Sequence, residues 1–224
     1  MPATPWRPRL QALLLDMDGL LIDSETLYWR AEREIARAHG TQVEDSTLRR
    51  MMGRRPIESM ELFRQDLGLA PDAATLLAER DVIMLELLAS EVQAKAGLDA
   101  LLAAFRGRAL YAVVTGAPRR MVDVVLQRLN LVTRFDFIQT SDHIRRGKPD
   151  PEIYLTAMSA LGLDAASCAV LEDSLNGVRA GKAAGAHVVA VPDVYSAGDD
   201  FSVADHVASD LAAAAEHLRD HFAA

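Results

Sequence analysis

The sequence predicts an α/β protein, with a parallel sheet covered by helices on both faces and an inserted all-helical segment. Three observations predict this class. From residue 97 onward, short apolar stretches alternate with helical patterns, which is typical of parallel strands joined by crossover helices. These stretches are apolar at consecutive positions, as expected of strands buried on both faces. Residues 24–94, by contrast, carry helical patterns and no strand candidate.

Length and composition limit the functional classes. A chain of 224 residues, half of them hydrophobic, can bury a core in one domain with an insertion. With 32 acidic and 24 basic residues, the net charge of −8 argues against nucleic acid or an anionic membrane as partner. No apolar stretch approaches the roughly 20 residues of a membrane span, and residues 1–6 have no signal-peptide pattern. Cys168, the only cysteine, is expected to be a buried structural thiol in a reducing cytoplasm.

The first half of the chain holds one strand and then the insertion. The strand is predicted at residues 10–15, and it ends at Asp16, Asp18 and Gly19. Helices are predicted at 26–38, 44–52, 57–67 and 72–90, with glycines after the first three. This change from a strand pattern to helical patterns predicts a core made of residues 1–23 and 95–224, and a helical insertion at 24–94.

The second half alternates between strands and helices. Strands are predicted at residues 109–114, 135–139, 168–171, 187–191 and, more briefly, 205–207. Helices are predicted at 98–105, 118–129, 152–161, 178–184 and 210–222. Gly181 lies inside one of these helices, where glycine costs about 1 kcal/mol unless close packing requires it.

Polar residues follow four of these apolar stretches, at the strand end or in the loop beyond. Right-handed crossovers bring such ends to one edge of a parallel sheet. Two carboxylates one residue apart resist joint ionisation unless a cation lies between them, and Mg²⁺ prefers carboxylate, water and phosphate oxygens. Each residue alone is more typical of an ordinary turn or surface position, but together they form a set suited to phosphoryl transfer. The set is Asp16, Asp18, Thr115, Lys148, Glu172 and Asp173.

Four segments carry a resemblance to a known family. They are residues 16–25 (DMDGLLIDSE), 114–116 (VTG), 147–151 (GKPDP) and 171–177 (LEDSLNG). With these segments, nearly the whole chain resembles the haloacid dehalogenase superfamily, in the branch of phosphatases and β-phosphoglucomutases with a small helical cap. The resemblance implies a Rossmann-like core, with residues 24–94 as the cap and hinges near 23–24 and 95–97.

The resemblance also implies roles for the polar residues. Asp16 would attack phosphorus to form an aspartyl-phosphate, and Asp18 would protonate the leaving alcohol and then deprotonate water. Thr115, Lys148 and the neighbouring Gly116 would hold the phosphoryl oxygens. Mg²⁺ would bind Asp16, the backbone carbonyl of Asp18 and Asp173, with Glu172 as a ligand or just behind one. The substrate would be a small phosphorylated metabolite.

Some positions depart from the family pattern or have no assigned role. Thr115 is followed by Gly116, Ala117 and Pro118 where many members carry Asn-Ser or Ala-Ser, and Ala96 replaces a frequent proline at the second hinge. Arg54 and Arg55 follow a helix of the insertion, and such a pair on a cap could close over a phosphate, carboxylate or sugar; a solvated surface pair is the alternative.

Three other functions remain as alternatives. A sugar-phosphate mutase must grip a second phosphate with its cap; residues 24–94 contain no lysine, although Arg54, Arg55 and Arg80 could serve. A dehalogenase would need neither Asp18 nor the Glu172-Asp173 pair. A phospho-accepting receiver module shares an Asp-Asp, Thr and Lys set, but it is about half this length and has no insertion to cover its site.

His217 and His221 form an i, i+4 pair in the last predicted helix. That spacing can bind a metal ion. Because the sequence indicates no third ligand, we expect an exposed surface pair.

Overall fold

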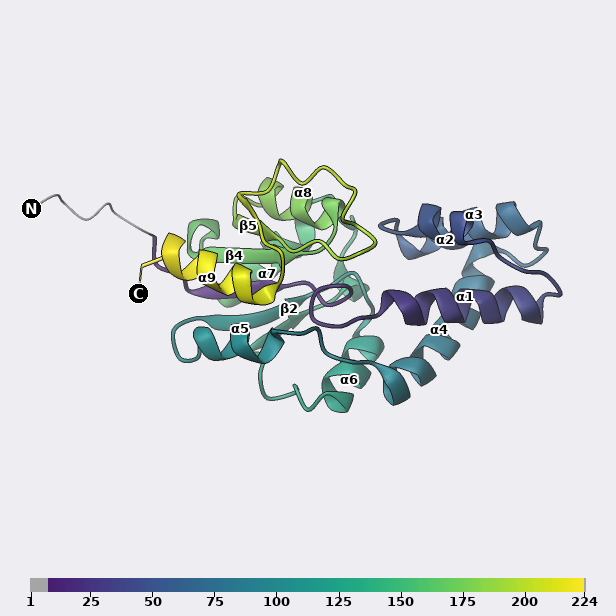
Figure 1. Ribbon diagram of the computed structural model, residues 1–224, viewed down its shortest axis with the longest axis horizontal. Helices are drawn as coiled ribbons and strands as arrows, with labels where there is room; N and C mark the ends of the chain where they lie inside the picture. Colours follow the sequence, from purple (N-terminus) through teal and green to yellow (C-terminus); the bar gives the residue numbers. More distant parts are fainter. Residues whose placement is uncertain (1–7, 224) are drawn as a thin grey trace, which may run out of the picture.

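The computed structural model describes residues 8–223, which contain a six-stranded sheet of order β3-β2-β1-β4-β5-β6 (Figure 1). Every neighbouring pair is parallel, so the predicted α/β class is confirmed. The first strand is two residues shorter at its start than predicted, and the short strand near residue 206 is present. The strands are β1 (Ala12–Leu15), β2 (Leu110–Val114), β3 (Phe137–Gln139), β4 (Cys168–Glu172), β5 (His187–Ala190) and β6 (His206–Val207).

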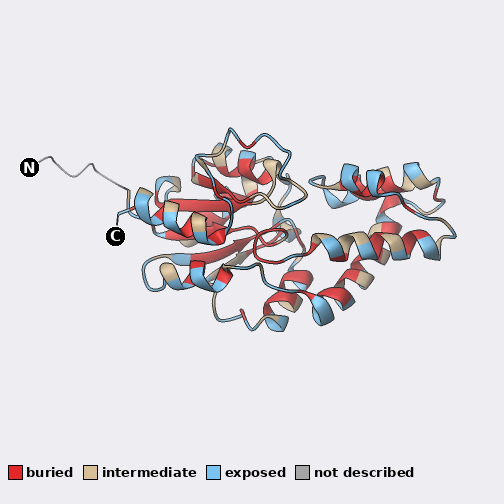
Figure 2. Cartoon of the chain, in the orientation of Figure 1, coloured by how far each residue is buried: buried red, intermediate tan, exposed pale blue. Residues whose placement is uncertain are grey.

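Helices cover both faces of the sheet. Successive side chains of a strand point to opposite faces, so Leu13 and Leu15 of β1 pack into one cluster and Leu14 into the other. The strands are accordingly buried along their length (Figure 2). The first cluster lies under α5 (Leu98–Ala104), α6 (Arg119–Arg128) and α9 (Leu211–His221). The second lies under α7 (Glu152–Leu161) and α8 (Leu175–Ala183).

The insertion forms four helices grouped at one end of the molecule (Figure 1). Their own core contains Met60, Phe63 and Leu76. The end of α4 instead packs into the first sheet cluster through Met84 and Leu88 and contacts α6. The helical group therefore rests on the sheet domain along α4 as well as facing its edge. The helices are α1 (Glu25–Ala38), α2 (Asp45–Met51), α3 (Pro56–Leu67) and α4 (Ala73–Glu91).

Two connections join the helical group to the sheet domain. They run side by side, because the Lys95 amide donates to the Leu21 carbonyl (2.9 Å) and the Asp23 amide to the Gln93 carbonyl (3.2 Å). The predicted boundaries and hinges fall here. The division into core and cap stays a prediction, and the first seven residues of the predicted core lie outside the described part.

Two local features concern α8. It begins at Leu175, three residues before the predicted start, because the Ser174 hydroxyl accepts a hydrogen bond from the Gly177 amide (3.2 Å) and caps the helix. A Cβ on Gly181 would lie 2.9 Å from Val188 Cγ2 and 3.0 Å from Val170 Cγ1. Close packing on the sheet therefore explains this glycine.

Cys168 is buried, as expected. Between residues 8 and 223, no helix has both the length and the apolar character needed to cross a membrane. The N-terminal stretch without a signal-peptide pattern lies outside the described residues.

Candidate active site

Asp16 follows the last residue of β1, at the centre of the sheet. Leu15 pairs with Val113 of β2 on one side and Leu171 of β4 on the other. The Asp16 amide continues this pattern by donating to the Leu171 carbonyl (3.1 Å). Asp16 is therefore held beside the carboxyl ends of both neighbouring strands, where ligands bind in open α/β sheets. Only 7% of Asp16 is exposed.

Lys148 reaches this carboxylate from the loop after β3. Its ammonium group donates to Asp16 Oδ1 (2.6 Å), to the Val114 carbonyl (3.3 Å) and to Glu172 Oε1. The side chain is largely buried. The two carboxylates hold the pKa of Lys148 well above its usual range, against the effect of burial. Lys148 therefore supplies a fixed positive charge beside Asp16.

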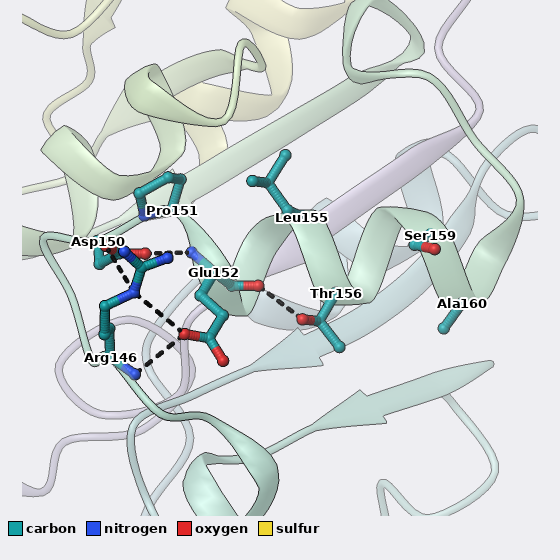
Figure 3. A pocket seen from close by; sticks show the side chains of 8 residues that line it. All are labelled: Arg146, Asp150, Pro151, Glu152, Leu155, Thr156, Ser159 and Ala160. Atoms are coloured by element: carbon teal, nitrogen blue, oxygen red, sulfur yellow. Dashed lines mark hydrogen bonds and ion pairs between the residues drawn. The ribbon is translucent and has the colours of Figure 1, made fainter.

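The loop that carries Lys148 is fastened to the start of α7 (Figure 3). The Glu152 carboxylate accepts hydrogen bonds from the backbone amides of Arg145 (2.9 Å) and Arg146 (3.1 Å). The Arg146 side chain folds back, with Nε 3.2 Å from Asp150 Oδ2 and 3.5 Å from Glu152 Oε2. The cavity of about 650 Å³ in Figure 3 lies along the outer side of this loop and α7. We attribute to these contacts a role in positioning Lys148.

Glu172, the last residue of β4, is completely buried, and its carboxylate faces polar groups of the protein. Oε1 accepts from Lys148 and from the Tyr154 hydroxyl (2.5 Å), and Oε2 accepts from the Ser174 hydroxyl (3.2 Å). A Cβ on Gly177 would collide with this carboxylate. Both oxygens therefore have protein donors, an arrangement that holds Lys148 in place.

Asp16, Glu172 and Asp173 form an acidic cluster, with one oxygen from each within 4.8 Å of the others. Burial, followed by repulsion from Glu172, raises the pKa of Asp16 to about 8. Burial and the charge of Asp16 raise the pKa of Asp173 well above its usual range. Gly19 makes room for the cluster, because a Cβ there would lie 2.1 Å from Asp173 Oδ2. An oxygen-only, repulsive donor set of this kind fits a hard divalent cation such as Mg²⁺.

Asp18 lies in a tight turn directly after Asp16. The turn is closed by bonds from the Leu21 and Ile22 amides to the Met17 carbonyl (2.9 and 3.1 Å). It passes through Gly19 at φ +75°, a backbone conformation that favours glycine. Burial raises the pKa of Asp18 above its usual value. A carboxyl group with a raised pKa is suited to both donating and accepting a proton near neutral pH.

Thr115 and Gly116 follow β2, next to the carbonyl that binds Lys148. Thr115 is almost fully buried, and its hydroxyl accepts from the Ala117 amide (3.1 Å). Gly116 is exposed and has open space where a side chain would be. The two residues are thus at the same edge of the sheet as Asp16, although Thr115 is turned toward its own loop.

Arg54 and Arg55 line a cavity of about 680 Å³ between the helical group and the sheet domain, together with Lys148 and Asn176. The Asn176 side chain donates to the Gly53 carbonyl across it (2.6 Å). Both arginines are exposed, and each is held within the helical group: Arg54 Nε donates to the Arg50 carbonyl (2.7 Å), and Arg55 Nε to Glu58 Oε1 (2.9 Å). They share a cavity with Lys148 without contacting the acidic cluster.

Three further residues lie in this region. Tyr154 lies just beyond one motif and Asn176 within another, but nothing in the pattern indicates that Tyr154 binds Glu172 or that Asn176 binds Gly53. Arg80 of α4 is buried, with its guanidinium carbon 5.1 Å from the centre of the Tyr28 ring and its Nε unpaired within the described residues. The sequence named Arg80 only as a possible phosphate ligand in the mutase alternative, and no pattern indicated that it would be buried.

Comparisons with known proteins agree with this geometry. Residues 10–185 match the family model for haloacid dehalogenase-like hydrolases. Protein CbbY of Rhodobacter capsulatus is 34% identical over 219 residues, covering 92% of this chain and 96% of that protein. The phosphorylated carbohydrates phosphatase of Thermotoga maritima is 32% identical over 180 residues, covering 79% and 82%.

Solved structures agree as well. A crystal structure of a CbbY mutant from Rhodobacter sphaeroides, in complex with xylulose-(1,5)bisphosphate, superposes with a TM-score of 0.82 at 27% identity. The match covers 91% of this chain and 95% of that one. The chain therefore belongs to the haloacid dehalogenase-like hydrolases, in the phosphatase branch of that family.

Proposed function

We propose that this phosphatase is a Mg²⁺-dependent hydrolase of a small phosphorylated carbohydrate and that Asp16 is its nucleophile. The observation that carries the proposal is the buried Asp16 carboxylate, 2.6 Å from the Lys148 ammonium at the edge of the acidic cluster. Membership of a hydrolase family argues against the receiver alternative. We also keep the expectations of a cytoplasmic protein with no nucleic-acid or membrane partner, which rest on its single buried cysteine and net charge of −8.

In the proposed reaction, a bond forms between an Asp16 oxygen and phosphorus while the bond from phosphorus to the substrate oxygen breaks. Asp18 gives its proton to that leaving oxygen, so that a neutral alcohol departs. Asp18 then accepts a proton from water, and the resulting hydroxide attacks the phosphoaspartate to release phosphate and restore Asp16. Lys148 reduces the repulsion between Asp16 and the phosphoryl oxygens.

Asp16, Asp173 and the backbone carbonyl of Asp18 would hold the Mg²⁺. When bound, the ion neutralises charge on the phosphoryl oxygens. Glu172 was predicted as a ligand or as a residue just behind one; because its oxygens already accept from Lys148, Tyr154 and Ser174, we assign it the second role. Thr115 and Gly116 would complete the phosphate site with their hydroxyl and amide groups.

The names of the relatives point to carbohydrate phosphates as substrates. We propose that Arg54 and Arg55 contact the hydroxyl or anionic groups of such a substrate in the cavity that they share with Lys148. Replacing either arginine by alanine should raise KM for the true substrate and leave turnover of p-nitrophenyl phosphate nearly unchanged. Arg49→Ala is the matched control, because Arg49 is an exposed arginine of α2 that does not line this cavity.

The test of the proposal is a turnover screen over sugar, polyol, nucleotide and short-acid phosphates, with and without EDTA. We expect release of inorganic phosphate that depends on Mg²⁺ and is lost in Asp16→Asn. To separate a hydrolase from a mutase, β-glucose 1-phosphate is supplied with catalytic bisphosphate. Glucose 6-phosphate and free phosphate are then followed together. Glucose 6-phosphate formed much faster than phosphate would contradict the hydrolase proposal.

A further inference from the structure

Four of the six histidines gather at the outer edge of the sheet, away from the acidic cluster. They form a histidine cluster made of His187 on β5, His206 on β6, and His217 and His221 on α9. The ring centres of His187 and His221 are 3.8 Å apart, as are those of His206 and His217. The expectation that His217 and His221 form an exposed pair without a third partner is therefore wrong. His187, thirty residues earlier, lies against them.

Three of these rings have nitrogen atoms close to one another. One nitrogen each from His187, His217 and His221 lies within 4.8 Å of the other two, and the Nε2 atoms of His187 and His217 are 2.9 Å apart. In a tetrahedral zinc site with Zn–N bonds of 2.0–2.1 Å, ligand nitrogens are about 3.3 Å apart. The rings of His187 and His221 are stacked, so the His221 ring would have to rotate to bring the three nitrogens to ligand spacing around one ion.

The surroundings of His187 also suit a metal ligand. Its Nδ1 lies 3.8 Å from Asp205 Oδ2, and a carboxylate behind a ligating histidine is a common outer partner. Asp205 is itself held in place by Lys182 Nζ (2.6 Å) and by the Val188 amide (2.7 Å). All four rings are partly buried. Neutral imidazole is the form that binds metal ions.

We propose that His187, His217 and His221 form a second metal site, which binds a divalent transition-metal ion of the zinc type. Imidazole ligands favour such ions over Mg²⁺. Three protein ligands leave one position for water. Because the ligands come from β5 and α9, the ion would join the last helix to the edge of the sheet and stabilise the folded chain.

This site is distinct from the acidic cluster in position and in chemistry. His187 pairs with Ala169, near the start of β4, whereas Glu172 at the end of β4 pairs with Ala190. The two sites are therefore separated by three residues of strand, or about 10 Å, along the sheet. The acidic cluster offers only oxygen atoms, and the histidine cluster only nitrogen atoms.

The test is a calorimetric titration of the tag-free protein with Zn²⁺ in millimolar Mg²⁺, so that the acidic cluster is already occupied. We expect one equivalent of Zn²⁺ to bind and to raise Tm by mass action. His217→Gln and His221→Gln should each weaken binding by at least about 100-fold, because loss of an outer partner alone costs 10- to 100-fold. His143→Gln, in the loop before Lys148 and outside the cluster, should bind Zn²⁺ like the wild type.

Circular dichroism and Mg²⁺-dependent turnover show whether each variant is folded. A measurement on the wild type needs no variant: substoichiometric Cu²⁺ should broaden the NMR signals of residues near 187, 217 and 221 before those near Asp16. The proposal is overturned by equal Zn²⁺ affinity in all variants, by absence of binding below millimolar Zn²⁺, or by broadening confined to the acidic cluster.

Discussion

Replacing Asp16 with asparagine should inactivate the enzyme and stabilise its metal-free fold. In the folded chain, burial and Glu172 raise the pKa of Asp16 from 3.8 to about 8. Between these two values the folded site holds a proton that the unfolded chain has released, so the stability of the wild type falls as pH rises. Asparagine is neutral at every pH, and its amide can donate to the neighbouring Asp173.

The size of this effect follows from the shift. One pKa unit corresponds to about 1.4 kcal/mol, so four units set an upper limit of about 6 kcal/mol above pH 8. Lys148 shares the charge and the site relaxes on ionisation, so we expect a gain of about 1–3 kcal/mol at pH 9. For a chain of this size, 1 kcal/mol changes Tm by about 2–4 °C, which predicts a rise of about 2–12 °C.

The assay is thermal unfolding of wild type and Asp16→Asn between pH 5 and pH 9, in EDTA and again in Mg²⁺. In EDTA the two Tm values should converge at low pH and separate as pH rises. In Mg²⁺ the advantage of the variant should shrink, because the ion stabilises the wild type more strongly. A variant with the lower Tm at pH 9 in EDTA, or a difference independent of pH, would refute the electrostatic argument.

Three further predictions test other parts of the structure. Asp18→Asn keeps its shape and backbone carbonyl, so Mg²⁺ binding should persist while turnover falls by 10²–10⁴-fold; wild-type rates would assign the proton transfers to another group. Asp173→Ala should lose both activity and the Mg²⁺-induced rise in Tm, and an unchanged rise would place the ion elsewhere. Gly181→Ala should destabilise the protein by about 1–2 kcal/mol in urea unfolding, because crowding of Val170 and Val188 outweighs the gain in helix propensity. A more stable variant would show that α8 can move.

The fold class was predictable from sequence because strands buried on both faces are apolar throughout, as β1 is. The strand ends were predictable because they carry the polar residues, and right-handed crossovers bring those ends together. Helix starts were less predictable: α8 begins at Leu175 because one hydroxyl, that of Ser174, caps it.

The side-chain partners within the site required the tertiary structure. The pattern placed Glu172 beside Asp173, but it could not show that Tyr154 and Lys148 both bind the Glu172 carboxylate. That arrangement depends on the direction in which α7 presents its side chains to the sheet. For the same reason, the sequence could not show whether Arg54 and Arg55 have hydrogen-bond partners. In the structure, Arg54 donates to the Arg50 carbonyl and Arg55 to the Glu58 carboxylate.

The histidine cluster shows most clearly the difference between what the sequence determines and what the tertiary structure decides. By itself the sequence determined that His217 and His221 share one face of a helix, because four residues make about one turn. It could not supply His187, since nothing in a linear pattern states which strand edge α9 covers. The packing of α9 decides that: its apolar residues, among them Leu211 and Leu218, are buried against the sheet, and this brings its two histidines onto β5.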